Sequence, residues 1–178
     1  SGKSFVAKEF GYPVFNADYE VSKLYQKDKK IFKKLKKILP KYIDVFPINK
    51  NQITHSILSN KSNLKKIVKI VHSEVRKKMW LFIKKNKNKK VLVFDIPLLL
   101  ENKISDKSFV LVFVDSKKSD ILKRLKNRPN YNKKLLEKFK KIQFSLEYKK
   151  RKSQFVIKNK FSKKSVKTSV NSILKKIL

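Results

Sequence analysis

The chain of 178 residues contains no cysteine, and that absence excludes several kinds of site. Without cysteine there is no disulfide framework and no thiolate metal centre, which agrees with a reducing cytosol. The two histidines are too few to build a histidine metal site. No apolar run reaches the roughly 20 residues that a membrane-spanning helix needs. We therefore expect a cytoplasmic protein without a membrane partner.

Acidic residues are also scarce, since 13 acids stand against 48 basic residues and give a formal charge of +35. Such a balance is typical of proteins that bind nucleic acid or anionic membranes. The lysines, however, are spread over nearly every segment, and abundant Lys, Asn, Ile and Phe with two glycines indicates a bias toward A/T-rich codons. We favour this bias and expect no obligatory nucleic-acid partner, while some affinity for polyanions stays open.

Arginine is rare in a chain so rich in lysine. The four arginines, against 44 lysines, are Arg76, Arg124, Arg128 and Arg151. A guanidinium group grips phosphate through two parallel hydrogen bonds, which an ammonium group cannot do. The positions that hold arginine are therefore the first candidates for phosphate contacts, with persistence by chance as the alternative.

One of the two glycines belongs to the opening segment Ser1-Gly2-Lys3-Ser4. This segment matches the second half of the phosphate-binding loop G-x-x-x-x-G-K-[ST], in which backbone N–H groups and the lysine hold phosphate oxygens and the hydroxyl binds Mg²⁺. An ordinary N-terminal turn is the alternative. The chain lacks an initiator Met and starts inside the motif. We therefore expect a truncated chain that lacks about one strand and half of the loop, and that is inactive and poorly stable by itself.

Three apolar runs predict strands that are buried in a parallel sheet, because none alternates apolar and polar residues. They cover 12–15, 91–95 and 109–115, and a shorter run covers 155–157. Helical spacing is predicted for 5–10, 119–126, 132–152 and a last helix from residue 162. Strands separated by helices predict the α/β class.

Two acids stand at the carboxyl ends of predicted strands, where open α/β sheets bind their ligands. Asp18 follows the strand 12–15, and Asp95 ends the strand 91–95. For Asp18 the alternative is a cap on the next helix. For Asp95 the alternative to ordering Mg²⁺-bound water is a salt-bridged structural role.

Between the first two strands, residues 27–86 show helical spacing with a break at Pro40 and Pro47. His72 and Arg76 are four residues apart and therefore share a helix face; a partly buried helix residue is the alternative for His72. The helix 132–152 is polar with a thin apolar stripe, which favours a mobile lid over a scaffold element.

The order of these motifs resembles the dephospho-coenzyme A kinase family, whose members are P-loop kinases that phosphorylate the ribose 3′-hydroxyl of dephospho-CoA. The matching segments are Gly2-Lys3-Ser4, Asn16-Ala17-Asp18 (for D-A-D), 71–76 (for H-P-x-V-R), Pro97-Leu98-Leu99-Leu100-Glu101 (P-L-L-x-E), Arg124-Leu125 with Arg128 (R-L-x-x-R), Gln143, Lys149 with Arg151 (K-x-R) and Ile157-Lys158-Asn159 (I-D-N). The match runs along essentially the whole chain. Departures are Asn16 and Lys158 in place of Asp, Ser73 in place of Pro, and Phe5 in place of Thr.

The resemblance implies a P-loop NTPase-like parallel sheet flanked by helices. The kinase core would comprise 1–27, 85–127 and 152–178, with a helical dephospho-CoA-binding insertion at 28–84 and a helical lid at 128–151. It implies ATP and dephospho-CoA as substrates, Mg²⁺ as the metal, and the last step of coenzyme A biosynthesis as the function. We expect a monomer.

The resemblance also implies roles for individual residues. The implied catalytic residues are Lys3, Asp18, Arg128 and Arg151. ATP would be bound by Ser1, Gly2, Lys3, Ser4, Phe5, Arg128 and Asn159, and Mg²⁺ by Ser4 and Asp95. The acceptor would be bound by Asp18, His72, Arg76, Pro97, Leu98 and Glu101.

Two other functions stay open. Another small-molecule P-loop kinase, acting on a nucleoside or nucleotide, is disfavoured by the helical insertion and by the segment from Pro97 to Glu101. A basic nucleic-acid-binding protein is a distant alternative. It would need exposed aromatic residues or a basic recognition face, whereas aromatics such as Phe94, Phe109 and Phe113 belong to strands that we expect to be buried.

Overall fold

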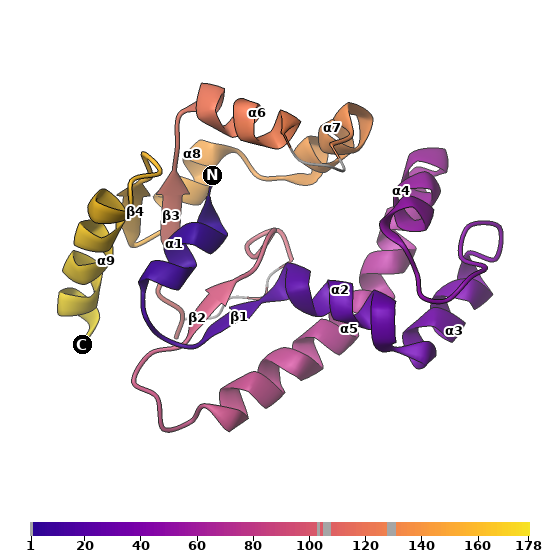
Figure 1. Ribbon diagram of the computed structural model, residues 1–178, viewed down its shortest axis with the longest axis horizontal. Coiled ribbons are helices and arrows are strands. Elements are labelled where there is room, and N and C mark those ends of the chain that lie inside the picture. The colour runs from indigo at the N-terminus through magenta and orange to yellow at the C-terminus, as the bar shows by residue number, and fades with distance from the viewer. Residues whose placement is uncertain (1, 103, 105–107, 128–130) are drawn as a thin grey trace.

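Four short strands and nine helices form the part of this computed structural model that covers residues 2–102, 104, 108–127 and 131–178 (Figure 1). The strands are β1 (Val14–Asn16), β2 (Val93–Asp95), β3 (Val112–Asp115) and β4 (Phe155–Lys158). Parallel strands are flanked by helices along the chain, so the predicted α/β class is confirmed.

The strands pair in parallel, as predicted, and form two pairs within the described residues. β1 pairs with β2, and the register sets Asn16 opposite Asp95. β3 pairs with β4, and Asp115 lies opposite Lys158. The register therefore brings polar side chains from two segments together at the carboxyl end of each pair.

The first three strands are shorter than predicted, β4 extends one residue further than predicted, and the strands are less buried than expected. β2 begins at Val93 and β3 at Val112, whereas the apolar runs begin at residues 91 and 109. All four residues of β3 are half-buried, as are the first two of β2. The reason is the narrow sheet, because each strand here has a hydrogen-bonded neighbour on one side.

The first and last helices of the chain pack together beside β4. They are α1 (Lys3–Glu9) and α9 (Lys163–Ile177). Their shared core contains the buried residues Val6, Ile157, Val166, Val170 and Ile173. Helix α1 begins at Lys3, so the helix that the phosphate-binding motif predicts is present.

A second, larger core lies among the helices between β1 and β2, which form the right half of Figure 1. These helices are α2 (Ala17–Lys27), α3 (Lys29–Ile38), α4 (Lys50–Ser59) and α5 (Lys61–Lys85). Each begins at an Asn or Asp side chain that accepts a backbone hydrogen bond, which explains why the helices start where they do. Pro40 and Pro47 lie between α3 and α4, as predicted.

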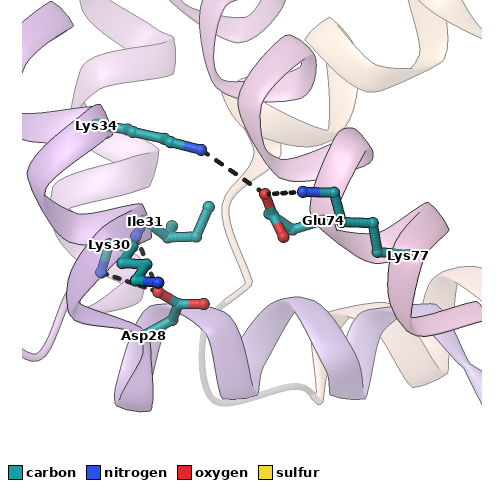
Figure 2. Close-up of polar contacts among 6 residues, drawn as sticks. All are labelled: Asp28, Lys30, Ile31, Lys34, Glu74 and Lys77. Carbon is teal, nitrogen blue, oxygen red and sulfur yellow. Dashed lines mark hydrogen bonds and ion pairs between the residues drawn. The ribbon is translucent and has the colours of Figure 1, made fainter. Parts of the chain in front are cut away.

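The few acids of the chain help to join these helices. Glu74 on α5 pairs with Lys77 of the same helix at 3.1 Å and with Lys34 of α3 at 3.7 Å (Figure 2). Beside them, the Asp28 carboxylate accepts hydrogen bonds from the N–H groups of Lys30 and Ile31 at the start of α3 (Figure 2). The lysines are exposed, so these pairs add little stability, and only the pair with Lys34 links α3 to α5.

Three helices between β3 and β4 form the upper part of Figure 1: α6 (Lys118–Lys126), α7 (Lys133–Ile142) and α8 (Leu146–Arg151). The predicted single helix over 132–152 is wrong, because the chain is extended at Gln143 and a new helix begins at Leu146 after the cap at Ser145. The Ser145 hydroxyl accepts a hydrogen bond from the Tyr148 N–H group, which starts α8. Among the described helices, none combines the length and the apolar character that crossing a membrane requires.

Candidate active site

The turn before α1 requires the glycine that the sequence supplies. Gly2 has φ +70, in the left-handed region. A Cβ atom at this position would lie 2.4 Å from Asn159 Nδ2 and 2.8 Å from Phe161 Cε1. The turn therefore packs directly against the segment that follows β4, and any other residue would push the two apart.

Ser4 lies in the first turn of α1 and contacts the end of β2. Its hydroxyl donates a 2.5 Å hydrogen bond to Asp95 Oδ2. Asp95 is buried, with 6% of its surface exposed. The contact joins the last residue of the phosphate-binding motif to the acid at the strand end, two features that are 91 residues apart in the sequence.

Asn16 is the third member of this cluster. Its side-chain N–H group donates to the same Asp95 oxygen at 2.8 Å, and its side-chain oxygen accepts from the Tyr19 N–H group. Asn16 is thus the cap of α2, and the alternative of a helix cap for Asp18 is wrong. Asp18 lies in the first turn of α2, where its side chain is exposed.

The chemistry of this cluster suits Mg²⁺. Hydroxyl and carboxylate oxygens are the hard ligands that Mg²⁺ prefers, and Ser4 and Asp95 present one of each. The described residues contain no group of three or more His, Cys, Asp or Glu side chains that could enclose a metal. This agrees with Mg²⁺ at phosphate sites, which is held by one or two protein ligands together with water and substrate phosphates.

A surface pocket of about 610 Å³ opens next to the glycine turn. Its lining includes Gly2, Phe5, Arg124 and Phe161. The Arg124 guanidinium lies over the Phe161 ring, 3.8 Å from its centroid. A planar cation on an aromatic ring, beside a phosphate-binding turn, offers flat surfaces on which a nucleotide base can stack.

Asn159 holds the wall of this pocket in place. It is buried, its N–H group donates to the Asp115 carbonyl oxygen at 2.7 Å, and its side-chain oxygen accepts from the Phe161 N–H group at 2.8 Å. Phe161 has φ +59, a left-handed conformation that is uncommon for a phenylalanine. The asparagine therefore fixes the turn that carries the aromatic ring.

Glu101 joins the segment after β2 to the connection between α7 and α8. Its Oε1 lies 2.7 Å from Lys149 Nζ and accepts a 3.0 Å hydrogen bond from the Phe144 N–H group. Burial raises the pKa of the Glu101 carboxyl, but the hydrogen bonds from Lys149 and from backbone N–H groups, with the Lys149 charge, outweigh it and lower the pKa overall. Glu101 is thus an ionised anchor for the connection between α7 and α8.

The remaining predicted acceptor residues fall into two groups. His72 and Arg76 lie on α5, and burial together with the nearby Arg76 charge lowers the pKa of His72. Pro97 and Leu98 follow β2 after one intervening residue, Ile96, and Leu98 has φ +56. Residues other than glycine that have this left-handed backbone conformation are frequent at functional sites.

Lys3 opens α1, with an exposed side chain, and Arg151 ends α8. The Arg151 guanidinium lies 5.9 Å from the centroid of the Tyr148 ring. Two other predicted site residues, Ser1 and Arg128, lie outside the described residues.

Sequence reasoning did not assign site roles to Asn16, Arg124 or Phe161. Asn16 departs from the D-A-D pattern, and its contact with Asp95 shows what the amide contributes. The scarcity of arginine did single out Arg124. No signal distinguished Phe161 among 13 phenylalanines.

Comparisons with known proteins find relatives along nearly the whole chain. The family model for dephospho-CoA kinase matches residues 1–165. The dephospho-CoA kinase of Wolbachia sp. subsp. Brugia malayi is 35% identical over 97% of this chain and 91% of its own length. That of Wolbachia pipientis wMel is 36% identical over the same shares.

Two solved structures share the fold. TT1252 from Thermus thermophilus has a TM-score of 0.75 at 22% identity and covers 99% of this chain and 92% of its own. A dephospho-CoA kinase from Campylobacter jejuni has a TM-score of 0.60 at 20% identity, over 97% of this chain and 88% of its own. The family model covers most of the chain and the curated relatives are more than 30% identical, so the chain belongs to the dephospho-CoA kinase family.

Proposed function

We propose that the protein transfers the γ-phosphoryl group of ATP to the ribose 3′-hydroxyl of dephospho-CoA, using the site described above. The observation that carries this proposal is the cluster of Ser4, Asn16 and Asp95. It joins a Gly-Lys-Ser turn to an acid at the carboxyl end of a parallel strand, which is the arrangement that a phosphoryl-transfer site in this type of fold requires.

The ATP molecule would span two neighbouring parts of the site. Backbone N–H groups at Gly2 and Ser4 and the Lys3 ammonium would bind the phosphates. The base would enter the pocket between Phe5, Arg124 and Phe161. The short connection through Gly2, which lines the pocket and precedes Lys3, supports this placement.

Mg²⁺, when bound at Ser4 and Asp95, would supply positive charge to the phosphate oxygens of ATP. The contacts that Asp95 makes orient its carboxylate toward Ser4 and Asn16. We propose that Asp95 orders water bound to the ion. The Asn16 amide would hold the carboxylate in position, because it donates to Asp95 while its own oxygen is held by the cap of α2.

Asp18 would act on the acceptor. In the reaction, the 3′-oxygen forms a bond to the γ-phosphorus, and the bond from that phosphorus to the bridging oxygen of ADP breaks. The 3′-hydroxyl proton passes to the Asp18 carboxylate, or to the transferred phosphoryl group while Asp18 orients the hydroxyl. The exposed position of Asp18 in the first turn of α2, beside Asn16, supports this role.

The acceptor would be held by the insertion at 28–84, and the lid at 128–151 would close over both substrates. We propose that residues 1–27, 85–127 and 152–178 form the kinase core, as the sequence predicts. His72, Arg76, Pro97 and Leu98 would line the acceptor pocket. Arg128 and Arg151 would neutralise the transferred phosphoryl group. Glu101, predicted to contact the acceptor, would also anchor the lid through Lys149.

The proposal is tested by offering several acceptors to the protein expressed from its full reading frame. The panel contains dephospho-CoA, adenosine, AMP and uridine, each with ATP and Mg²⁺, and ³¹P NMR identifies the product. We expect rapid phosphorylation of dephospho-CoA alone. Preferred phosphorylation of a nucleoside or nucleotide would instead support the other kinase class.

We also propose a cytoplasmic monomer, which sedimentation of the purified protein and fractionation of cells would check.

A further inference from the structure

Helix α4 differs from the other described helices at its C-terminal end. Every other helix in the described residues carries at least one lysine or arginine in its last turn, as the basic composition leads one to expect. The last turn of α4 carries none. Its final carbonyl groups, which have no partner within the helix and bear partial negative charge, must be satisfied from elsewhere.

Lys138 of α7 supplies the missing charge. Its ammonium group donates to the carbonyl oxygens of Ile57 at 2.6 Å and of Leu58 at 2.9 Å. Both carbonyls belong to the last turn of α4, 80 residues or more from Lys138 in the sequence. Two charge-assisted hydrogen bonds from one half-buried ammonium form a strong and directional contact between the lid and the insertion.

An apolar contact lies one turn away on the same helix. Leu135 is half-buried and packs against the core of the insertion. Figure 1 shows α7 beside α4, and the two helices are in contact. Leu135 and Lys138 are three residues apart, so they lie on one face of α7 and present an apolar and a charged contact to the insertion together.

The other end of the lid is fixed to the core. Phe144, between α7 and α8, and Lys149 on α8 both contact Glu101 after β2. The described part of the lid is therefore held at two points, by Glu101 on the core and by α4 on the insertion. Arg151 lies two residues after Lys149 on the same helix, next to the contact with Glu101.

We infer that Lys138 is a positioning residue of the kinase, which latches the lid onto the dephospho-CoA-binding insertion by capping α4. This inference rests on the proposed function for the identity of the acceptor. The latch links the segment that binds the acceptor to the helices that carry the phosphate-binding arginine. Loss of the latch lowers the fraction of molecules in which the acceptor-binding segment and the helix that carries Arg151 are both correctly positioned.

The test compares three variants of the protein expressed from its full reading frame. Lys138→Met keeps the length of the side chain and removes its donors, and Lys138→Arg keeps donors. Lys140→Met changes an exposed lysine of the same helix. Hydrogen exchange is measured at 50–60 and 133–142, kcat/KM is measured for dephospho-CoA, and Tm is measured for each variant.

We expect Lys138→Met to speed exchange in α7 and in the last turn of α4, and to lower kcat/KM for dephospho-CoA roughly tenfold per folded molecule. Lys138→Arg should keep most of the protection against hydrogen exchange and most of the kcat/KM for dephospho-CoA. Lys140→Met should match the parent protein in both measurements. Unchanged exchange in Lys138→Met overturns the latch. A lower Tm with unchanged kcat/KM overturns the positioning role and leaves Lys138 a structural cap.

Failure of the proposed function would be visible separately. If the parent protein phosphorylates no dephospho-CoA, the proposed acceptor is wrong. The exchange measurement still decides whether Lys138 holds α7 on α4, because it requires no substrate.

Discussion

The hydroxyl group of Ser4 and the carboxylate of Asp95 share a 2.5 Å hydrogen bond that joins the start of α1 to the end of β2. Asp95 is buried, and Ser4 belongs to the Gly-Lys-Ser turn. A buried carboxylate that faces this hydroxyl is well placed to support a divalent cation on the phosphates of ATP. The pair can be tested by removing the charge of Asp95 while keeping its shape.

Asp95→Asn should lower the apparent affinity for Mg²⁺ roughly tenfold or more in the kinase reaction, because the charge that favours the cation is lost. The measurement is the rate of phosphoryl transfer as a function of Mg²⁺ concentration at saturating substrates. Asp44→Asn is the control, since Asp44 is exposed and lies in the insertion. An unchanged Mg²⁺ dependence in Asp95→Asn would return Asp95 to a structural role.

Asn16→Asp should destabilise the protein without Mg²⁺, although it creates the D-A-D pattern. Aspartate caps a helix as well as asparagine does, so α2 keeps its cap. The new carboxylate, however, would face Asp95 across the 2.8 Å contact where an amide now donates. Like charges at this distance oppose ionisation, and we expect a loss of about 1–3 kcal/mol in the free energy of unfolding.

Denaturant unfolding in EDTA and in Mg²⁺ checks this prediction, and Mg²⁺ should recover part of the loss. A variant that is as stable as the parent protein in EDTA would show that the contact between Asn16 and Asp95 contributes little.

Arg124→Lys should raise the KM for ATP about three- to tenfold and change kcat little, because the ammonium group cannot stack as a plane between Phe161 and a base. Steady-state kinetics at saturating dephospho-CoA measure this effect. Arg151→Lys should instead lower kcat, because it weakens a contact made to the transferred phosphoryl group. Lys126→Arg, an exposed change on α6, should alter neither constant. Equal effects of Arg124→Lys and Arg151→Lys on kcat would contradict the separate roles.

The anchor at Glu101 predicts a dependence of stability on pH. The pKa of Glu101 in the folded protein is lowered from its ordinary value of 4.5. The ionised carboxylate therefore adds to the free energy of unfolding in full above pH 4.5, and this contribution is lost as the pH falls through the folded-state pKa. Glu101→Gln should therefore cost about 1–2 kcal/mol at pH 7, and the difference from the parent protein should shrink below pH 4.5.

Unfolding by denaturant at several pH values measures this difference. Glu137→Gln on α7 is the control, because Glu137 is exposed. A difference between Glu101→Gln and the parent protein that stays constant down to acid pH would argue against an ionised anchor.

Sequence patterns predicted the parts of the site that depend on local order. Helix α1 begins at Lys3, because the glycine turn before it determines where the helix starts. Asp95 ends a parallel strand, because the apolar run before it favours a buried strand. The register that brings Asn16 opposite Asp95 could not be predicted, since it depends on pairing between segments 79 residues apart. The sequence indicated one helix over 132–152, but the structure has two, α7 and α8, with Ser145 as the cap of the second.

Long-range contacts of common residue types also escaped prediction. Lys138 is one of 44 lysines, and nothing nearby in the sequence marks it as the cap of α4. Phe161 is one of 13 phenylalanines, and its contact with Arg124 depends on how the turn after β4 packs against α6. In both cases composition hides the important residue, because many residues of the same type occur elsewhere in the chain.

The most direct test of the proposed function is the transfer of phosphate to dephospho-CoA by the parent protein and by Asp18→Asn, both expressed from the full reading frame. We expect the parent protein to form the 3′-phosphate, and Asp18→Asn to lower kcat on the order of a hundredfold or more with little change in the KM for ATP. No transfer by the parent protein would contradict the proposed function, and equal turnover by the two proteins would contradict the role of Asp18.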